Sequence, residues 1–202
     1  MFLIIVLLIF FIIIFAYYSK NKITKRKITH TKRNHTGMTD VEYIHTHINT
    51  KDIFEILNVA YCYDRLGAKY RKDSLLWFET FLKVYEQNKN NKSVLKQSFT
   101  TEEVWSIYSK MAMLYEREYR WDDAIYCLNK CTEIDKGNNA EDYTRVGDIL
   151  VKKDLNLAVE YYDNLVKNKV VYSKHSKIID QKRKDVQGKR INGYKYVPRP
   201  RK

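Results

Sequence analysis

The first candidates for a chemical function are the three cysteines, Cys62, Cys127 and Cys131. Cys127 and Cys131 are one helical turn apart, a spacing that could serve a metal ion or a redox pair. No histidine or further cysteine lies near them in the sequence to complete a ligand set. An odd number of cysteines without regular spacing is not a disulfide framework. We therefore predict free thiols that are buried or partly buried, in a reducing compartment such as the cytosol.

The histidines do not form a recognisable metal site either. His45 and His47 are two residues apart and so do not share a helical face, and no cluster of cysteines or carboxylates accompanies them or His30 and His35. The sequence also lacks a phosphate-binding glycine loop and any Ser-His-Asp or Cys-His motif. We predict that the protein is not an enzyme and that it has no metal, no cofactor and no small-molecule substrate.

Composition and charge describe a helical domain between two basic flanks. The chain has 202 residues but only 6 glycines and 2 prolines, which favours helices over a sheet with many turns. The formal net charge of +13 divides into +6 for residues 19–40, +9 for residues 170–202 and −2 for the remainder. A basic surface across the fold is therefore not expected, and nucleic-acid binding is an unlikely role.

Residues 2–18 form an unbroken apolar and aromatic run without a charge. As a helix this run would span ~25 Å, near the short end for a membrane span. A buried core helix would need one polar face, which this run lacks. A cleaved signal peptide is the stronger alternative, but no basic residue precedes the run, and Ala16-Tyr17-Tyr18 is a poor cleavage site. We predict an uncleaved single-pass transmembrane anchor at residues 1–18.

A basic segment follows the apolar run and predicts its orientation. Positive charge next to a span stays in the cytoplasm, so the C-terminal domain is expected to be cytoplasmic. Two glycosylation sequons, at Asn34 and Asn91, point the other way, and we give the charge bias more weight. The segment 19–40 has no hydrophobic periodicity and reads as a juxtamembrane linker. The predicted membrane-surface residues are Lys20, Lys22, Lys25, Arg26 and Lys27.

A repeated pattern of apolar residues covers the centre of the chain. Each copy has a first helix with a small residue between aromatic or aliphatic residues, a short turn, and a second helix that begins near an alanine. In the two clearer copies the turns are expected at residues 120–123 and 152–154. The small residues would let the two helices of a pair approach closely while large side chains fill the remaining space. The first copy of this pattern spans residues 53–86. The two clearer copies contain Tyr108, Met111, Ala112, Tyr115, Ala124, Leu128 and Cys131, and then Tyr143, Val146, Gly147, Leu150, Ala158, Tyr162 and Leu165.

At these residues the sequence resembles the tetratricopeptide repeat, whose period is 34 residues. Ala124 and Ala158 are separated by this period. The family's usual proline is missing, since Lys136 and Val170 fall near its place. We therefore expect an all-α fold of about three such repeats, with a capping helix from Val170 to Val186, in a domain that spans residues 41–187. The apolar face of this capping helix is expected to carry Val171, Ile178, Ile179 and Val186. Thr100 or Thr101 with Glu103 predicts a helix start. Residues 188–202 are expected to be a basic, disordered tail.

The resemblance implies that a protein partner binds along the concave face formed by the first helices. Its groove-facing positions correspond here to Tyr61, Ser109, Met113, Thr144 and Asp148. None of these is basic, so a chaperone carboxylate clamp is not expected, and a basic or hydrophobic partner segment suits the near-neutral domain better. The expected function is a membrane-anchored interaction scaffold. Alternatives are a vesicle-tethering factor resembling soluble attachment proteins, and a nucleic-acid binder acting through the basic flanks.

Overall fold

The computed structural model describes residues 37–91, 99–167, 175–194 and 196. The chain divides into two compact units, Met1–Thr39 and Asp40–Lys202. The predicted anchor at 1–18 and the predicted membrane-surface residues lie outside the described residues. Within those described ranges, none of the helices has both the length and the apolar character needed to cross a membrane.

The described part of the second unit consists of eight α-helices and one short 3₁₀ helix, without a strand, which confirms the all-α prediction. Their bounds are α2 (Asp40–His47), α3 (Ile53–Arg65), η1 (Ala68–Tyr70), α4 (Arg71–Asn88), α5 (Thr101–Arg117), α6 (Trp121–Ile134), α7 (Ala140–Lys153), α8 (Leu155–Lys167) and α9 (Ser176–Ile191).

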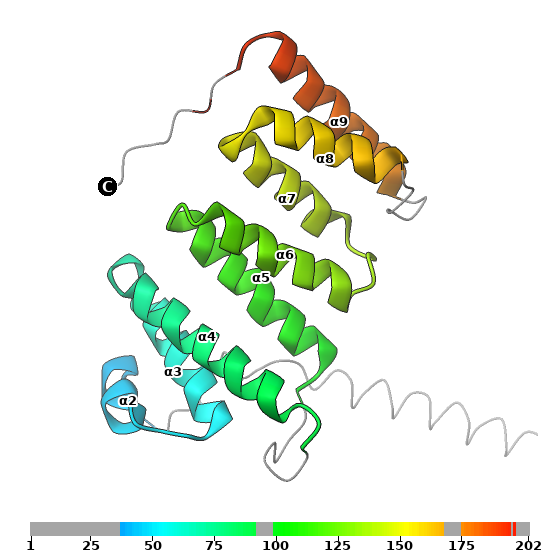
Figure 1. Cartoon of the computed structure of the whole chain (residues 1–202). Coiled ribbons are helices and arrows are strands. Elements are labelled where there is room, and N and C mark those ends of the chain that lie inside the picture. Colours follow the sequence, from blue (N-terminus) through cyan, green and yellow to red (C-terminus); the bar gives the residue numbers. More distant parts are fainter. Residues whose placement is uncertain (1–36, 92–98, 168–174, 195, 197–202) are drawn as a thin grey trace, which may run out of the picture. The chain divides into compact units, whose positions relative to one another are not determined.

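Helices that follow one another in the chain pack side by side, and three hairpins result (Figure 1). The hairpins are α3 with α4, α5 with α6, and α7 with α8. Helix α2 packs on α3 before the first hairpin, and α9 packs on both α8 and α7 after the third. We call α3, α5 and α7 the first helices.

The predicted start of α5 is confirmed by a capping box. The Thr100 hydroxyl accepts a hydrogen bond from the Glu103 amide at 3.1 Å, and the Glu103 carboxylate accepts one from the Thr100 amide at 2.7 Å. These two bonds satisfy amide groups that a helix start otherwise leaves without partners. Asp52 caps α3 and Asn139 caps α7 in a similar way through their side-chain oxygens.

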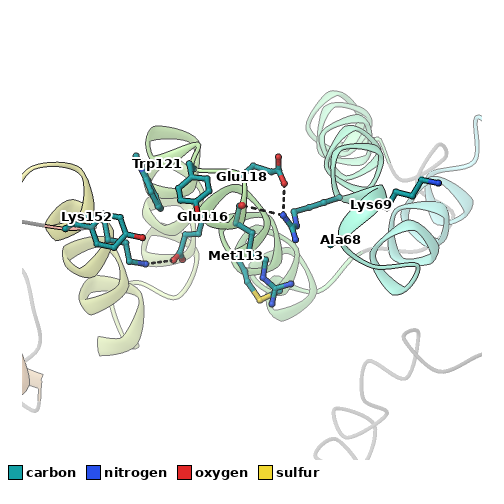
Figure 2. Close-up of a pocket in the computed structure, with 11 residues that line it drawn as sticks. Ala68, Lys69, Met113, Glu116, Glu118, Trp121 and Lys152 are labelled. Atoms are coloured by element: carbon teal, nitrogen blue, oxygen red, sulfur yellow. Dashed lines mark hydrogen bonds and ion pairs between the residues drawn. The ribbon is translucent and has the colours of Figure 1, made fainter. Parts of the chain in front are cut away.

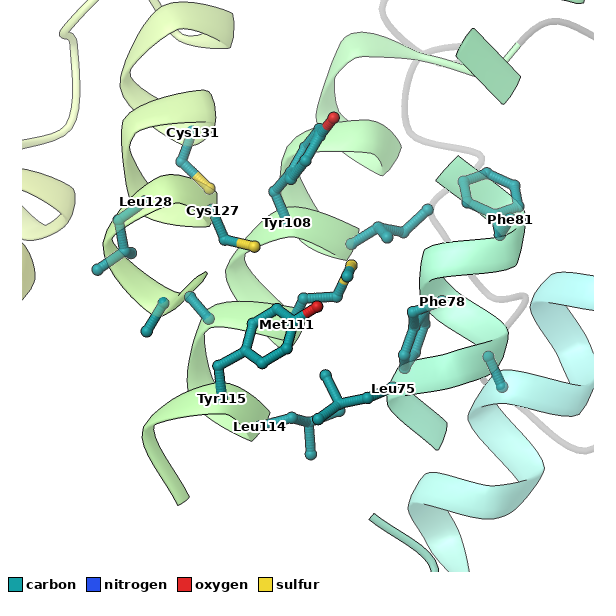
Figure 3. Packing of buried hydrophobic residues seen from close by; sticks show 14 of the residues in the cluster. Leu75, Phe78, Phe81, Tyr108, Met111, Leu114, Tyr115, Cys127, Leu128 and Cys131 are labelled. Carbon is teal, nitrogen blue, oxygen red and sulfur yellow. The ribbon is translucent and has the colours of Figure 1, made fainter. Parts of the chain in front are cut away.

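The apolar faces expected from the repeated pattern form the core. In the middle hairpin, Tyr108, Met111, Ala112 and Tyr115 of α5 are all buried, and they face α4 and α6 across a continuous cluster (Figure 3). This cluster reaches from α3 to α7. A second cluster joins α7, α8 and α9, and includes Tyr162, Ile179 and Val186. Each hairpin is therefore held by its neighbours as well as by its own two helices.

Close approach between the helices of a pair depends on a small residue, as predicted. A Cβ atom added at Gly147 of α7 would lie only 2.2 Å from the Tyr162 Cζ atom of α8. The Tyr162 hydroxyl donates to the Thr144 carbonyl at 3.3 Å. The large ring of one helix thus fills the space that the small residue of the other leaves open.

The structure corrects several predicted boundaries. The turn expected at residues 152–154 is shorter, because α7 runs to Lys153 and α8 begins at Leu155. Trp121, expected in a turn, already begins α6. The capping helix α9 continues to Ile191, so the expected domain end at 187 falls inside it. Ile178, expected on its apolar face, is 50% exposed, whereas Ile179 and Val186 are buried. Neighbouring positions on a helix point in different directions, so only one of Ile178 and Ile179 can face α8.

Candidate functional site

Ion pairs connect each first helix to the next. Lys110 of α5 lies 2.6 Å from Asp64 of α3. Arg145 of α7 occupies the position equivalent to Lys110, and it lies 3.4 Å from Glu116 of α5. Lys182 of α9 continues the series with Asp148 of α7 at 3.0 Å. The row of first helices therefore carries polar contacts that fix the spacing between hairpins.

Most residues predicted to face a groove take part in these contacts or in packing. Ser109 accepts a hydrogen bond from Arg145 at 3.0 Å, and the Thr144 hydroxyl donates to the Glu141 carbonyl of its own helix. Asp148 is exposed but bound to Lys182. Tyr61 packs edge-on against Phe78 of α4, and burial raises its pKa to about 12.

Met113, the fifth residue predicted to face the groove, lines an open pocket of about 760 Å³. The pocket lies where the turn of the first hairpin, the turn of the second hairpin and the end of α7 meet (Figure 2). We call it the turn pocket. It is lined by Ala68, Lys69, Arg71, Met113, Glu116, Arg117, Glu118, Tyr119, Trp121, Lys152 and Tyr196.

Two ion pairs border the turn pocket, and both are visible in Figure 2. Arg71 binds Glu118 at 2.6 Å, and a second bond from Arg71 reaches the Arg117 carbonyl at 3.4 Å. On the other side, Lys152 lies 3.4 Å from Glu116. The Arg71–Glu118 pair is short and half-buried, so it holds the two turns at a fixed distance.

Positive charge is in excess around Glu116. Arg145 and Lys152 share this single carboxylate, each at 3.4 Å. Arg117, one position further along α5, is exposed, and its guanidinium has no ion pair or hydrogen bond to any residue that the structure describes. Figure 2 shows Lys69 directed away from Met113, and its ammonium lies over the Tyr70 ring instead. The side chains that face the pocket therefore favour a negatively charged ligand.

Aromatic side chains form the other part of the wall. Tyr119 packs edge-on against Trp121, with ring centroids 5.4 Å apart. The Lys152 ammonium lies 5.7 Å from the centroid of the Trp121 ring. An aromatic wall next to cationic groups can bind apolar and charged parts of a ligand at the same time.

Tyr119, in the wall of the turn pocket, has an unusual backbone conformation. Its φ is 59°, in the left-handed region that favours glycine. The conformation ends α5, because the Tyr119 amide donates to the Glu116 carbonyl and the Arg120 amide donates to the Tyr115 carbonyl. Tyrosine adopts this conformation at a cost in backbone energy, and its ring forms part of the wall of the turn pocket.

The cysteines and histidines considered first lie elsewhere. All three cysteines are buried and free, as predicted, and burial raises the pKa values of the Cys62 and Cys127 thiols to about 12. His47 stacks on Tyr43 and is hydrogen-bonded to its carbonyl at 2.9 Å. Across the described ranges, no three His, Cys, Asp or Glu side chains gather in a way that could hold a metal ion.

Met113, which lines the turn pocket, was singled out from the sequence, but the residues that surround it were not. Arg71, Glu118 and Lys152 come from the ends of three different helices, and no local pattern marks them as neighbours. Trp121 could have been recognised from the sequence, because a large aromatic residue at the start of a helix needs a surface to cover it.

In comparisons with protein-family models, with curated proteins and with solved structures, nothing matches the chain. The geometry of the site therefore carries the functional argument.

Proposed function

We propose that this chain is a membrane-anchored scaffold of tetratricopeptide type, which binds an extended segment of a partner protein along its first helices and in the turn pocket. The observation that carries the proposal is the turn pocket itself. It draws its wall from two hairpin turns and a third hairpin's first helix, so a ligand there contacts three hairpins at once.

The repeat assignment is supported by packing that recurs at equivalent positions. Gly147 and Ala112 occupy the same place in α7 and α5, and both are buried. Lys110 and Arg145 make equivalent ion pairs to the preceding first helix. Recurrence of both the close contact and the polar contact favours repeated units over an unrelated helical bundle.

The membrane anchor is proposed from the sequence of residues 1–18 and of the basic segment after it. The apolar run is suited to one span, and the lysines and arginines that follow would keep the helical domain in the cytoplasm. A partner bound by the domain would then be concentrated at a membrane surface.

The proposal can be tested with a photo-crosslinking amino acid in place of Ala68, which lines the turn pocket and is exposed. The same amino acid at position 178, exposed on α9, is the matched control. The full-length chain would be irradiated in cells. We expect a protein adduct from position 68 that is missing from position 178.

The specificity of the adduct can be checked at Met113. Met113→Glu should abolish the adduct, because it places a carboxylate in the apolar part of the wall, whereas Met113→Leu should preserve it. Circular dichroism would show that both variants keep their helices. An adduct that survives Met113→Glu, or equal adducts at both positions, would contradict the proposal.

A further inference from the structure

The chain's own tail already places an aromatic side chain at the turn pocket. After α9, the backbone reverses at Gly193, whose φ is 66°. The Gly193 amide donates to the Arg190 carbonyl at 3.2 Å and the Tyr194 amide donates to the Lys189 carbonyl at 3.0 Å, which fixes this turn. Beyond it, Tyr196 is half-buried and lines the turn pocket together with Trp121 and Lys152.

The charge of the tail does not match the charge of the pocket. Lys189 and Arg190 precede Tyr196, and the sequence after it contains Arg199, Arg201 and Lys202. The pocket itself presents Arg117, and Arg145 and Lys152 share one carboxylate. The tail therefore brings an aromatic side chain to the pocket, but the residues around that side chain are positively charged, as is the excess charge of the pocket.

We propose that the turn pocket is a receptor for an aromatic side chain flanked by carboxylates on a partner segment, and that Tyr196 occupies the aromatic subsite until such a segment displaces it. This inference rests on the proposed function and names the partner's chemistry and its internal competitor. A segment of this kind places an aromatic ring in the pocket that Trp121 also lines and adds ion pairs to Arg117 and Lys152, which the tail cannot make.

The test uses the full-length chain in mild detergent and a fluorescent synthetic peptide with a tyrosine between glutamates. Anisotropy gives the Kd at low ionic strength. Tyr196→Ala should lower the apparent Kd about fivefold, the factor expected when a competitor occupies the pocket for about four-fifths of the time. Arg117→Glu and Lys152→Glu should each raise the Kd about tenfold, whereas Lys177→Glu, on an exposed cation of α9, should leave it unchanged.

Two control peptides test the chemistry of recognition. Replacing the tyrosine by alanine should abolish binding, and replacing the glutamates by lysines should also abolish it. Equal or tighter binding of the lysine peptide would overturn the charge preference, and equal binding of the alanine peptide would overturn the aromatic subsite.

Whether Tyr196 occupies the pocket can be measured without a ligand. With fluorinated tryptophan, the resonance of Trp121 should shift in Tyr196→Ala, while the resonances of Trp77 and Trp105 stay in place. An unchanged Trp121 resonance together with an unchanged Kd would overturn the internal competition. The scaffold proposal would survive that result if position 68 still crosslinks to a partner, so the two failures can be told apart.

Discussion

At the scale of single residues, the contact between Gly147 and Tyr162 shows what a sequence can and cannot predict. The need for a small residue in the first helix followed from the repeated pattern. The identity of the atom that fills the space, the Tyr162 hydroxyl 3.3 Å from the Thr144 carbonyl, depends on how far the helices approach. That distance is set by all the side chains between them, which no single position encodes.

Substituting Gly147 by alanine should destabilise the protein. The added Cβ would clash with the Tyr162 ring, and overpacking of this kind costs about 1–3 kcal/mol of unfolding free energy. Gly188→Ala in α9 is the matched control, because its Cβ would meet no atom within 4 Å. There the gain in helix propensity should stabilise by up to about 1 kcal/mol. Urea denaturation of both variants measures the difference, and equal effects would refute the packing argument.

Asp142 is a buried carboxylate whose charge should weaken the fold at neutral pH. It is 1% exposed and accepts a hydrogen bond from the Trp105 indole at 3.0 Å. Burial raises its pKa above 3.8, against the opposite effect of the Trp105 bond. A raised folded-state pKa means that the stabilisation is complete below the unfolded pKa and is lost as the pH rises through the folded one.

Asp142→Asn should therefore raise the melting temperature at pH 7, because it keeps an accepting oxygen for Trp105 and removes the charge. The advantage should shrink as the pH falls through the raised folded-state pKa of Asp142 and should be gone below about 4, where the aspartate is neutral in both the folded and the unfolded chain. Calorimetric scans of both proteins across this range would measure it. A melting temperature that falls at pH 7 would mean that the α7 N-terminus and Arg145 stabilise the ionised carboxylate more than burial opposes it.

At the scale of elements, helix starts were easier to predict than turns. Thr100 and Glu103 carry a local signal, because each bonds the backbone of the other. The length of the turn between α7 and α8 carries no such signal. It depends on Asp154, whose carboxylate accepts from the Asn156 amide at 2.7 Å and so starts α8 at once. The same residue type could equally have belonged to a longer loop.

Thr100→Ala should cost about 1 kcal/mol of unfolding free energy, because the Glu103 amide loses its acceptor at the exposed end of α5. Thr101→Ala is the control, since Thr101 is exposed in the first turn and its side chain does not cap the helix. Thermal melts of the two variants would separate the contributions. A smaller loss for Thr100→Ala than for Thr101→Ala would refute the capping role.

At the scale of the whole described domain, stability should decrease in steps along the chain. The cluster that spans α3 to α7 and the cluster that spans α7 to α9 meet at α7. In stacked hairpins each unit depends mainly on its neighbours, so local damage should remain local.

Val186→Asp places a charge at a position that is 2% exposed between α9 and its neighbours. Amide hydrogen exchange should then accelerate in α8 and α9, and partly in α7, while α3 to α6 keep their protection. Mass spectrometry of peptic fragments resolves these segments. Uniform acceleration from α3 to α9 would show a single cooperative unit instead.

Net charge and local charge lead to different proposals for the charge of a partner segment. The near-neutral sum for residues 41–169 led to the expectation of a basic or hydrophobic segment. The local arrangement is the ground on which we propose an acidic one. Arg145 and Lys152 share Glu116, and Arg117 beside it has no ion pair among the described residues, while acidic residues such as Asp64 and Asp148 are bound to lysines. Which charges face a pocket is a property of three-dimensional pairing and does not follow from the total.

The left-handed Tyr119 makes the protein's stability and the binding that we propose compete for the same position. A glycine there would relieve about 1 kcal/mol of backbone cost and would remove the ring that packs against Trp121. A library of variants selected for heat resistance should therefore become enriched in glycine at position 119, and one selected for capture of the partner should retain tyrosine. Directed evolution toward a sturdier domain would thus erode the recognition for which we propose it exists.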